Sequence, residues 1–153
     1  MLDPNNNSAT QMVAEINGLL ADHFALYVKT KNFHWHVKGP RFRDLHLLFD
    51  EQAVAIQAQI DVIGERARKL GGNTITSIGM IGQHTQVKDQ NDANLPAEDM
   101  IRELRDDNAV VVARLKSMKD TADAAGDNAT DGLLDDWTDA AEERVWFLNS
   151  LLG

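Results

Sequence analysis

The sequence of 153 residues predicts an all-α fold: a bundle of four long helices, with a short crossover helix between the second and the third. Three observations lead to this class. Apolar residues recur at helical spacing in four long stretches, and glycine or proline separates these stretches. No stretch alternates polar and apolar residues as a half-buried strand would. The length suits one domain over residues 1–153, with residues 1–7 expected to form a flexible N-terminal tail.

The first two long helices have recognisable ends. Ser8 and Gln11 fit a capping box at the start of the first helix, and the Gly-Pro pair at 39–40 ends it. The second helix is expected over about residues 41–70. Its end is predicted by two consecutive glycines at 71–72, because glycine often adopts the backbone conformation that closes a helix.

The second half of the sequence contains the crossover and two more long helices. Residues 73–95 form a long connection, in which a short helix is expected within 74–86. Pro96 is expected in the first turn of the third helix, which the Gly-Asp-Asn segment at 126–128 separates from a last helix over about 131–152. Four long helices with one long crossover between the second and third match the topology of ferritin-like bundles.

Composition limits the partners and the chemistry. The chain has no cysteine, which excludes disulfides and thiolate zinc sites. Its net charge is −9 and neither end of the sequence holds a basic cluster, so binding of DNA or RNA is disfavoured. An acidic surface suits cations, although it would serve solubility equally well. Without a signal-peptide pattern or a run of about 20 apolar residues, the protein is expected in the cytoplasm and not in a membrane.

Four residues of the second helix could bind metal. His46 and Asp50 form one pair at i,i+4 spacing, and Asp61 and Glu65 form another. At about 100° per residue the four lie within roughly 100° of one another around the helix, so they form one stripe. Imidazole and carboxylate groups together suit iron and other first-row divalent metals.

The spacing of the two pairs predicts a site shared between two chains. Their midpoints are separated by about 22 Å along the helix, so one ion cannot touch both pairs in one chain. If the helix packs antiparallel against its own copy, His46 and Asp50 face the second pair of the partner, and two equivalent sites result. His34 can complete each site if the first helix packs beside the second. Solvated surface pairs, or a dimer interface without metal, remain alternatives.

The residues around this stripe carry a family resemblance. They read Phe33-His34-Trp35-His36-Val37-Lys38-Gly39-Pro40 and Phe42, then His46, Phe49-Asp50-Glu51, Asp61 and Gly64-Glu65-Arg66-Ala67. This pattern resembles the Dps mini-ferritins over nearly the whole chain. The resemblance implies a hollow dodecamer that oxidises Fe(II) with hydrogen peroxide or dioxygen, preferentially with the peroxide. It further implies that the dodecamer stores Fe(III) mineral and protects the cell and its DNA from oxidative damage. It also implies that His34, His46 and Asp50 come from one subunit and Asp61 and Glu65 from its partner.

A site inside each bundle is disfavoured. The larger classical ferritins use a Glu-x-x-His motif for an intrasubunit di-iron site, and that motif does not occur in this sequence. The remaining histidines, at 23 and 84, receive no role.

Two neighbours of the predicted ligands have alternative interpretations. Trp35 alone would be interpreted as a core residue, whereas the resemblance places it near the site, where it can intercept stray oxidising equivalents. His36 is either a group that supports the ligands or an exposed side chain. Further along, Asp123, Asp127 and Asp131 belong to an acidic segment that lines iron-entry pores in relatives. Helix N-terminal charges in a solvated loop would explain the same segment.

Two functions compete with ferroxidase activity and iron storage. One is a nucleoid-associated protein that coats DNA directly, which the acidic charge disfavours. The other is a structural cage without metal.

Overall fold

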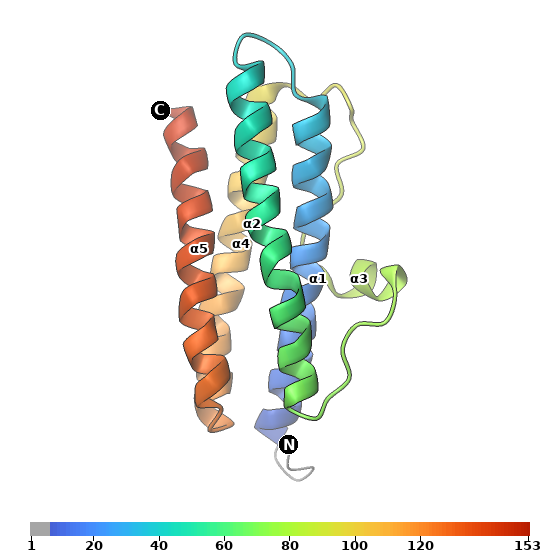
Figure 1. Cartoon of the computed structure of the whole chain (residues 1–153), viewed down its shortest axis with the longest axis vertical. Helices are drawn as coiled ribbons and strands as arrows, with labels where there is room; N and C mark the ends of the chain where they lie inside the picture. The colour runs from blue at the N-terminus through green and yellow to red at the C-terminus, as the bar shows by residue number, and fades with distance from the viewer. Residues whose placement is uncertain (1–6) are drawn as a thin grey trace.

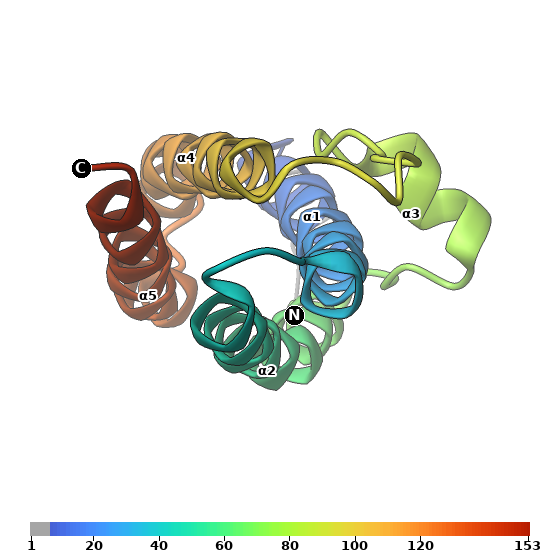
Figure 2. The same cartoon turned by 90° about the horizontal axis from the view of Figure 1, so that it is seen from above.

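The computed structural model describes residues 7–153 and confirms the all-α prediction. Its helices are α1 (Asn7–His36), α2 (Phe42–Lys69), α3 (Ile78–His84), α4 (Ala97–Ala124) and α5 (Asn128–Leu152). The four long helices form a bundle in which α1 and α5 run one way and α2 and α4 run the other (Figure 1). Seen along the bundle, α1 contacts α2 and α4, α5 contacts the same two helices, and α3 packs outside against α1 (Figure 2).

The first seven residues were expected to be a tail. Residues 1–6 lie outside the described residues, and Asn7 already begins α1. Between residues 7 and 153, no helix is long and apolar enough to cross a bilayer.

The bundle is held together by one apolar stripe from each long helix. On α2, for example, Leu45, Phe49, Ile56 and Ile63 are buried at helical spacing. Burying a large apolar side chain contributes roughly 1.5–3 kcal/mol, so the stripes supply most of the force that aligns the helices.

The ends of α2 and α4 use the same backbone motif. Gly71 adopts a φ of 89°, and its N–H donates to the Arg68 carbonyl at 2.9 Å. The next N–H, from Gly72, reaches the Ala67 carbonyl at 3.0 Å. Gly126, with a φ of 65°, closes α4 in the same way. Glycine is favoured at both positions because a positive φ costs it nothing.

Three helix starts differ from the prediction. Ser8, expected as the cap of the first helix, lies inside α1, and the Gln11 side chain donates to Glu15 at 3.2 Å. The last helix begins at Asn128 rather than near residue 131, because the Asp127 side chain caps it by accepting from the Thr130 backbone N–H at 3.0 Å. Pro96 is the N-cap of α4 rather than a first-turn residue, and the helix itself begins at Ala97.

The long crossover lies along α1 and is attached to it by polar side chains. Near the start of α1, the Asn17 amide hydrogen-bonds to the backbone of Asn73 and Ile75. Further along, Asp22 accepts from the Thr85 hydroxyl and the Gln86 N–H. Closer to the end of α1, Lys29 donates to the Lys88 carbonyl and Asn32 to the Gln90 carbonyl. These bonds measure 2.7–3.1 Å. They fix the crossover in place although only the 7 residues of α3 are helical within it.

Candidate metal centre

His34 and His46 face each other where α1 ends and α2 begins. Their rings stack with centroids 3.9 Å apart and an angle of 14° between planes. The Nδ1 atom of His34 donates to the His46 carbonyl at 2.6 Å, and Nδ1 of His46 donates to the His34 carbonyl at 2.7 Å. Because a carbonyl can only accept, each Nδ1 carries the hydrogen. In the neutral rings each Nε2 then holds the lone pair that a metal ion needs.

Asp50 lies one helical turn beyond His46 on α2. Its Oδ1 is 3.9 Å from Nε2 of His34 and accepts a hydrogen bond from Lys31 Nζ at 2.8 Å. That hydrogen bond is the main reason why the pKa of Asp50 is lowered. The carboxylate is 44% exposed, so it can be reached from outside the chain. Lys31 Nζ also lies over the Trp35 ring, 5.8 Å from its centre.

Asp61 and Glu65 form a separate group further along α2. Both are exposed, and helix geometry places them about 22 Å from the first pair. Within residues 7–153, no three His, Cys, Asp or Glu side chains gather closely enough to hold a metal ion. Both groups carry donor atoms that suit iron, but one chain keeps them apart; we call these two candidate groups the partial sites.

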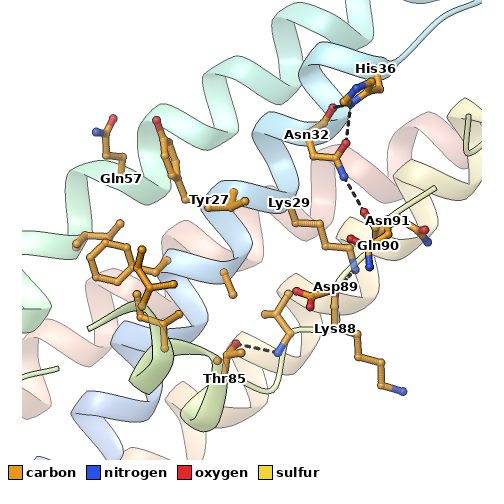
Figure 3. Close-up of a pocket in the computed structure, with 18 of the residues that line it drawn as sticks. Tyr27, Lys29, Asn32, His36, Gln57, Thr85, Lys88, Asp89, Gln90 and Asn91 are labelled. Carbon is orange, nitrogen blue, oxygen red and sulfur yellow. Dashed lines mark hydrogen bonds between the residues drawn. The ribbon is translucent and has the colours of Figure 1, made fainter. Parts of the chain in front are cut away.

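The surface beside Asp61 is hollowed. A groove of about 1090 Å³ lies between α1, α2 and the segment that includes α3 and continues to residue 93 (Figure 3). Phe24, Val28 and Ile81 contribute apolar surface to it, and Asp61 stands at its border. A smaller hollow of about 300 Å³ is bordered by both Asp61 and Glu65. The second partial site is thus surrounded by concave, largely apolar surface.

The two neighbours of the predicted ligands both lie at the surface. Trp35 is 63% exposed, so its interpretation as a residue of this subunit's core is wrong. His36 is also exposed, and its Nδ1 lies 2.9 Å from the carbonyl and 2.7 Å from the side-chain oxygen of Asn32, within its own helix.

The three predicted pore residues differ in their surroundings. Asp127 is the N-cap of α5, its side chain is only 8% exposed, and Arg66 Nη2 lies 3.6 Å from it. Asp131 pairs with Lys119 at 2.8 Å. Asp123 is exposed near the end of α4. Asp127 therefore has the helix N-terminal role of the alternative interpretation, although it lies in a mostly buried position rather than in a solvated loop.

A group of buried polar side chains was not predicted. His23, Gln52, Asn108 and Arg144 come one from each long helix and meet in the interior; we call them the polar layer. Arg144 Nε donates to Asn108 Oδ1 at 2.7 Å, and Gln52 Nε2 lies 3.4 Å from the Arg144 carbonyl. The sequence does contain a signal, because Arg144 follows Ala141 and precedes Leu148 at the spacing of the buried stripe.

Burial determines the charges of the polar layer. His23 Nδ1 donates to the Leu19 carbonyl at 3.0 Å, and Nε2 lies 2.9 Å from the Gln59 side-chain amide. Loss of hydration lowers the pKa of His23 to about 4, so the ring is neutral near pH 7. Loss of hydration also lowers the pKa of Arg144 to about 10, which leaves the guanidinium charged. A neutral histidine beside a buried cation is a poor place for a metal ion.

Comparisons with known proteins agree on one family. Residues 13–153 match the model of the ferritin-like domain. The DNA protection during starvation protein of Brevibacillus brevis is 35% identical over 95% of this chain and 97% of its own length. A solved structure of Dps from Thermosynechococcus elongatus is 26% identical, covers 99% of this chain and 96% of its own, and superposes with a TM-score of 0.95.

A second solved structure extends this agreement. Dps from Vibrio cholerae O1, described as a member of a broad superfamily of ferritin-like diiron-carboxylate proteins, is 26% identical, with a TM-score of 0.91 over 99% of this chain and 94% of its own. The sequence match and the fold lead to the same assignment: the chain belongs to the Dps family of ferritin-like proteins.

Proposed function

We propose that this protein is a ferroxidase that takes up Fe(II), oxidises it with hydrogen peroxide, and stores the Fe(III) product inside a dodecameric cage. The observation that supports this most directly is the separation of two partial sites with matching ligand chemistry. His34, His46 and Asp50 stand together, whereas Asp61 and Glu65 lie about 22 Å away along the same helix. Antiparallel packing of α2 against a second copy would join them into complete sites.

Each ligand has a role in this proposal. Asp50 and Glu65 anchor iron in both oxidation states, because anionic oxygen suits Fe(II) and Fe(III). The two imidazoles, whose orientation is fixed by the bonds from Nδ1, give more exchangeable ligation through Nε2. Two Fe(II) ions each lose one electron, and hydrogen peroxide takes up both electrons with two protons to give water. Trp35, which is exposed beside Lys31, would intercept an oxidising equivalent that escapes.

The concave surface beside Asp61 supports the shared site. Apolar hollows of this size at a surface usually mark an interaction site. Packing of a second copy there would bury Phe24 and Val28 and bring the second partial site to an interface.

A paired substitution tests the ferroxidase assignment. The double variant His46→Ala/Asp50→Ala should oxidise Fe(II) with peroxide at least about tenfold more slowly, as expected when two direct ligands are removed. His84→Ala/Asp139→Ala removes the same residue types from exposed positions away from the proposed ligands and should oxidise at the wild-type rate. Equal rates in the wild type and the first variant would refute the assignment and favour a cage without metal.

Iron is proposed to enter near the α4–α5 turn. Of the three aspartates there, Asp123 is the exposed one, whereas Asp127 caps α5 and Asp131 pairs with Lys119. Asp123→Asn should therefore slow iron uptake at physiological salt, and Asp139→Asn should not. An unchanged uptake rate in Asp123→Asn would exclude this residue from the entry path.

Protection of DNA, which the name of the Brevibacillus brevis relative describes, is proposed here as indirect. Removal of iron and peroxide in the cytoplasm would prevent oxidative damage without contact. With a net charge of −9, the chain should not retard DNA in a gel-shift assay at neutral pH and low salt. Strong retardation would instead favour direct coating of DNA.

A further inference from the structure

Lys31 hydrogen-bonds to the carboxylate of Asp50, which the proposed function assigns to iron binding. It lies on α1 one turn before His34, and its Nζ is 2.8 Å from Asp50 Oδ1. That same oxygen is the one that lies 3.9 Å from Nε2 of His34. The oxygen closest to the imidazole is therefore already bound to an ammonium group.

An ammonium group and a divalent ion cannot both bind this oxygen closely. Two cations a few ångströms apart repel each other strongly, more so in a partly buried place. The Lys31 side chain is 21% exposed, and its ammonium group is carried by a flexible chain of four carbons. Nζ can therefore leave Asp50 for solvent without unfolding α1, and it would then leave the face of Trp35 as well.

We propose that Lys31 is a displaceable internal cation: it neutralises Asp50 in the metal-free protein, and a metal ion must expel it in order to bind. This inference rests on the proposed function, since it concerns the same site. Lys31 holds the carboxylate in place through its hydrogen bond, and it weakens the binding of a metal ion to the same oxygen. Weaker binding suits a site from which the oxidised product must move on into storage.

Zinc titration calorimetry on the assembled protein tests the exchange, because Zn(II) has no redox chemistry. Lys31→Met removes the competing cation and should tighten Zn(II) binding roughly three- to tenfold. Lys31→Arg keeps the cation and should bind like the wild type. Lys38→Met is the matched control. It removes the same charge from an exposed lysine that contacts Asn94, and its affinity should change less than about twofold.

Tryptophan emission gives a second measurement. If Zn(II) expels Lys31 from the Trp35 face, emission should change on binding. The change should disappear in Trp35→Phe and shrink in Lys31→Met, although both variants still bind Zn(II). Equal Zn(II) affinity and equal emission changes in the wild type and Lys31→Met would overturn the role of Lys31 and leave the proposed function standing. Failure of the wild type and of every variant to bind Zn(II) would count against the proposed function instead.

Discussion

The protein contains histidines in two polar regions, and they differ in what surrounds the second ring nitrogen. In the polar layer, both nitrogens of His23 lie against polar groups of the protein, and the nearby charge is the positive Arg144. At the end of α1, His34 and His46 use only Nδ1 to hold each other, and Nε2 of His34 points toward Asp50. A histidine is thus available as a metal ligand when one ring nitrogen is free of protein hydrogen bonds and the nearest charged group is negative.

The two regions also differ in their cost to stability. Arg144 is only 4% exposed, and its Nη1 and Nη2 have no hydrogen-bond partner among residues 7–153. Burying a charge with incomplete hydrogen bonding opposes folding. At the proposed metal site, Asp50 and Lys31 are partly exposed and satisfy each other. We therefore expect mutations to affect stability mainly in the interior and metal binding mainly at the surface.

The largest effect is expected at Arg144. Arg144→Ala removes a buried side chain and strips Asn108 of its donor, so the free energy of unfolding should fall by about 3–5 kcal/mol. Arg144→Met also leaves the Asn108 oxygen without its donor, but it fills most of the volume without burying a charge, so its loss should be smaller, about 1–2 kcal/mol. Urea unfolding followed by circular dichroism measures both. If Arg144→Met lowers the free energy of unfolding as much as Arg144→Ala does, the guanidinium group itself is required for stability.

Acid should destabilise the protein through His23. Its pKa is about 4 in the folded chain against 6.5 for an unperturbed histidine, so only the unfolded state takes up a proton between these values. No stability is lost through this group above pH 6.5. Below it the loss grows as the pH falls and levels off near pH 4, at about 3 kcal/mol. Urea midpoints between pH 7 and pH 4 should show this loss, and His23→Gln should flatten it. An equal loss in His23→Gln would assign the acid sensitivity to other groups.

Metal binding should depend on the surface histidines and not on His23. His46→Ala should weaken Zn(II) binding at least about tenfold, equivalent to about 1.4 kcal/mol, while lowering stability by only about 1 kcal/mol through lost hydrogen bonds. His23→Gln should leave the Zn(II) affinity of the folded protein unchanged. Calorimetry at pH 7 compares the two variants. Weaker binding in His23→Gln would mean that the interior and the proposed site are coupled.

The smallest effect is expected at His36. Within residues 7–153, this exposed ring hydrogen-bonds only to Asn32. His36→Ala should therefore change stability by less than about 0.5 kcal/mol and leave Zn(II) affinity within about twofold. A larger loss of affinity would give His36 a part in supporting the ligands.

The helices could be predicted from the sequence because their signals are local. The paired glycines at 71–72 ended α2 as expected, since a C-terminal motif needs only adjacent residues. The sequence predicts the start of α5 too late, because the Gly-Asp-Asn segment that contains Asp127 has the composition of a break between helices. Its capping bond to Thr130 shows that the same residue begins the helix.

The site was predictable only in part. The spacing of His46, Asp50, Asp61 and Glu65 is visible within one helix, and the two separate groups in the structure follow from it. Lys31 was missed because its partner Asp50 lies 19 residues away on another helix. Arg144 and Asn108 were missed for the same reason, being 36 residues apart. Pairing between helices depends on their packing, which apolar periodicity does not specify.

The attachment of the crossover to α1 limits how its length can vary. Along α1, the bonds from Asn17, Asp22, Lys29 and Asn32 reach residues 56, 64, 59 and 58 positions later in the chain. The crossover therefore runs parallel to α1, and α3 lies between the attachments from Asn17 and Asp22. A deletion or insertion between residues 86 and 90 would move the later contacts away from their partners on α1, whereas the stretch around α3 can vary with less effect. The part of the crossover that leads into α4 thus has its length set by the helix beside it.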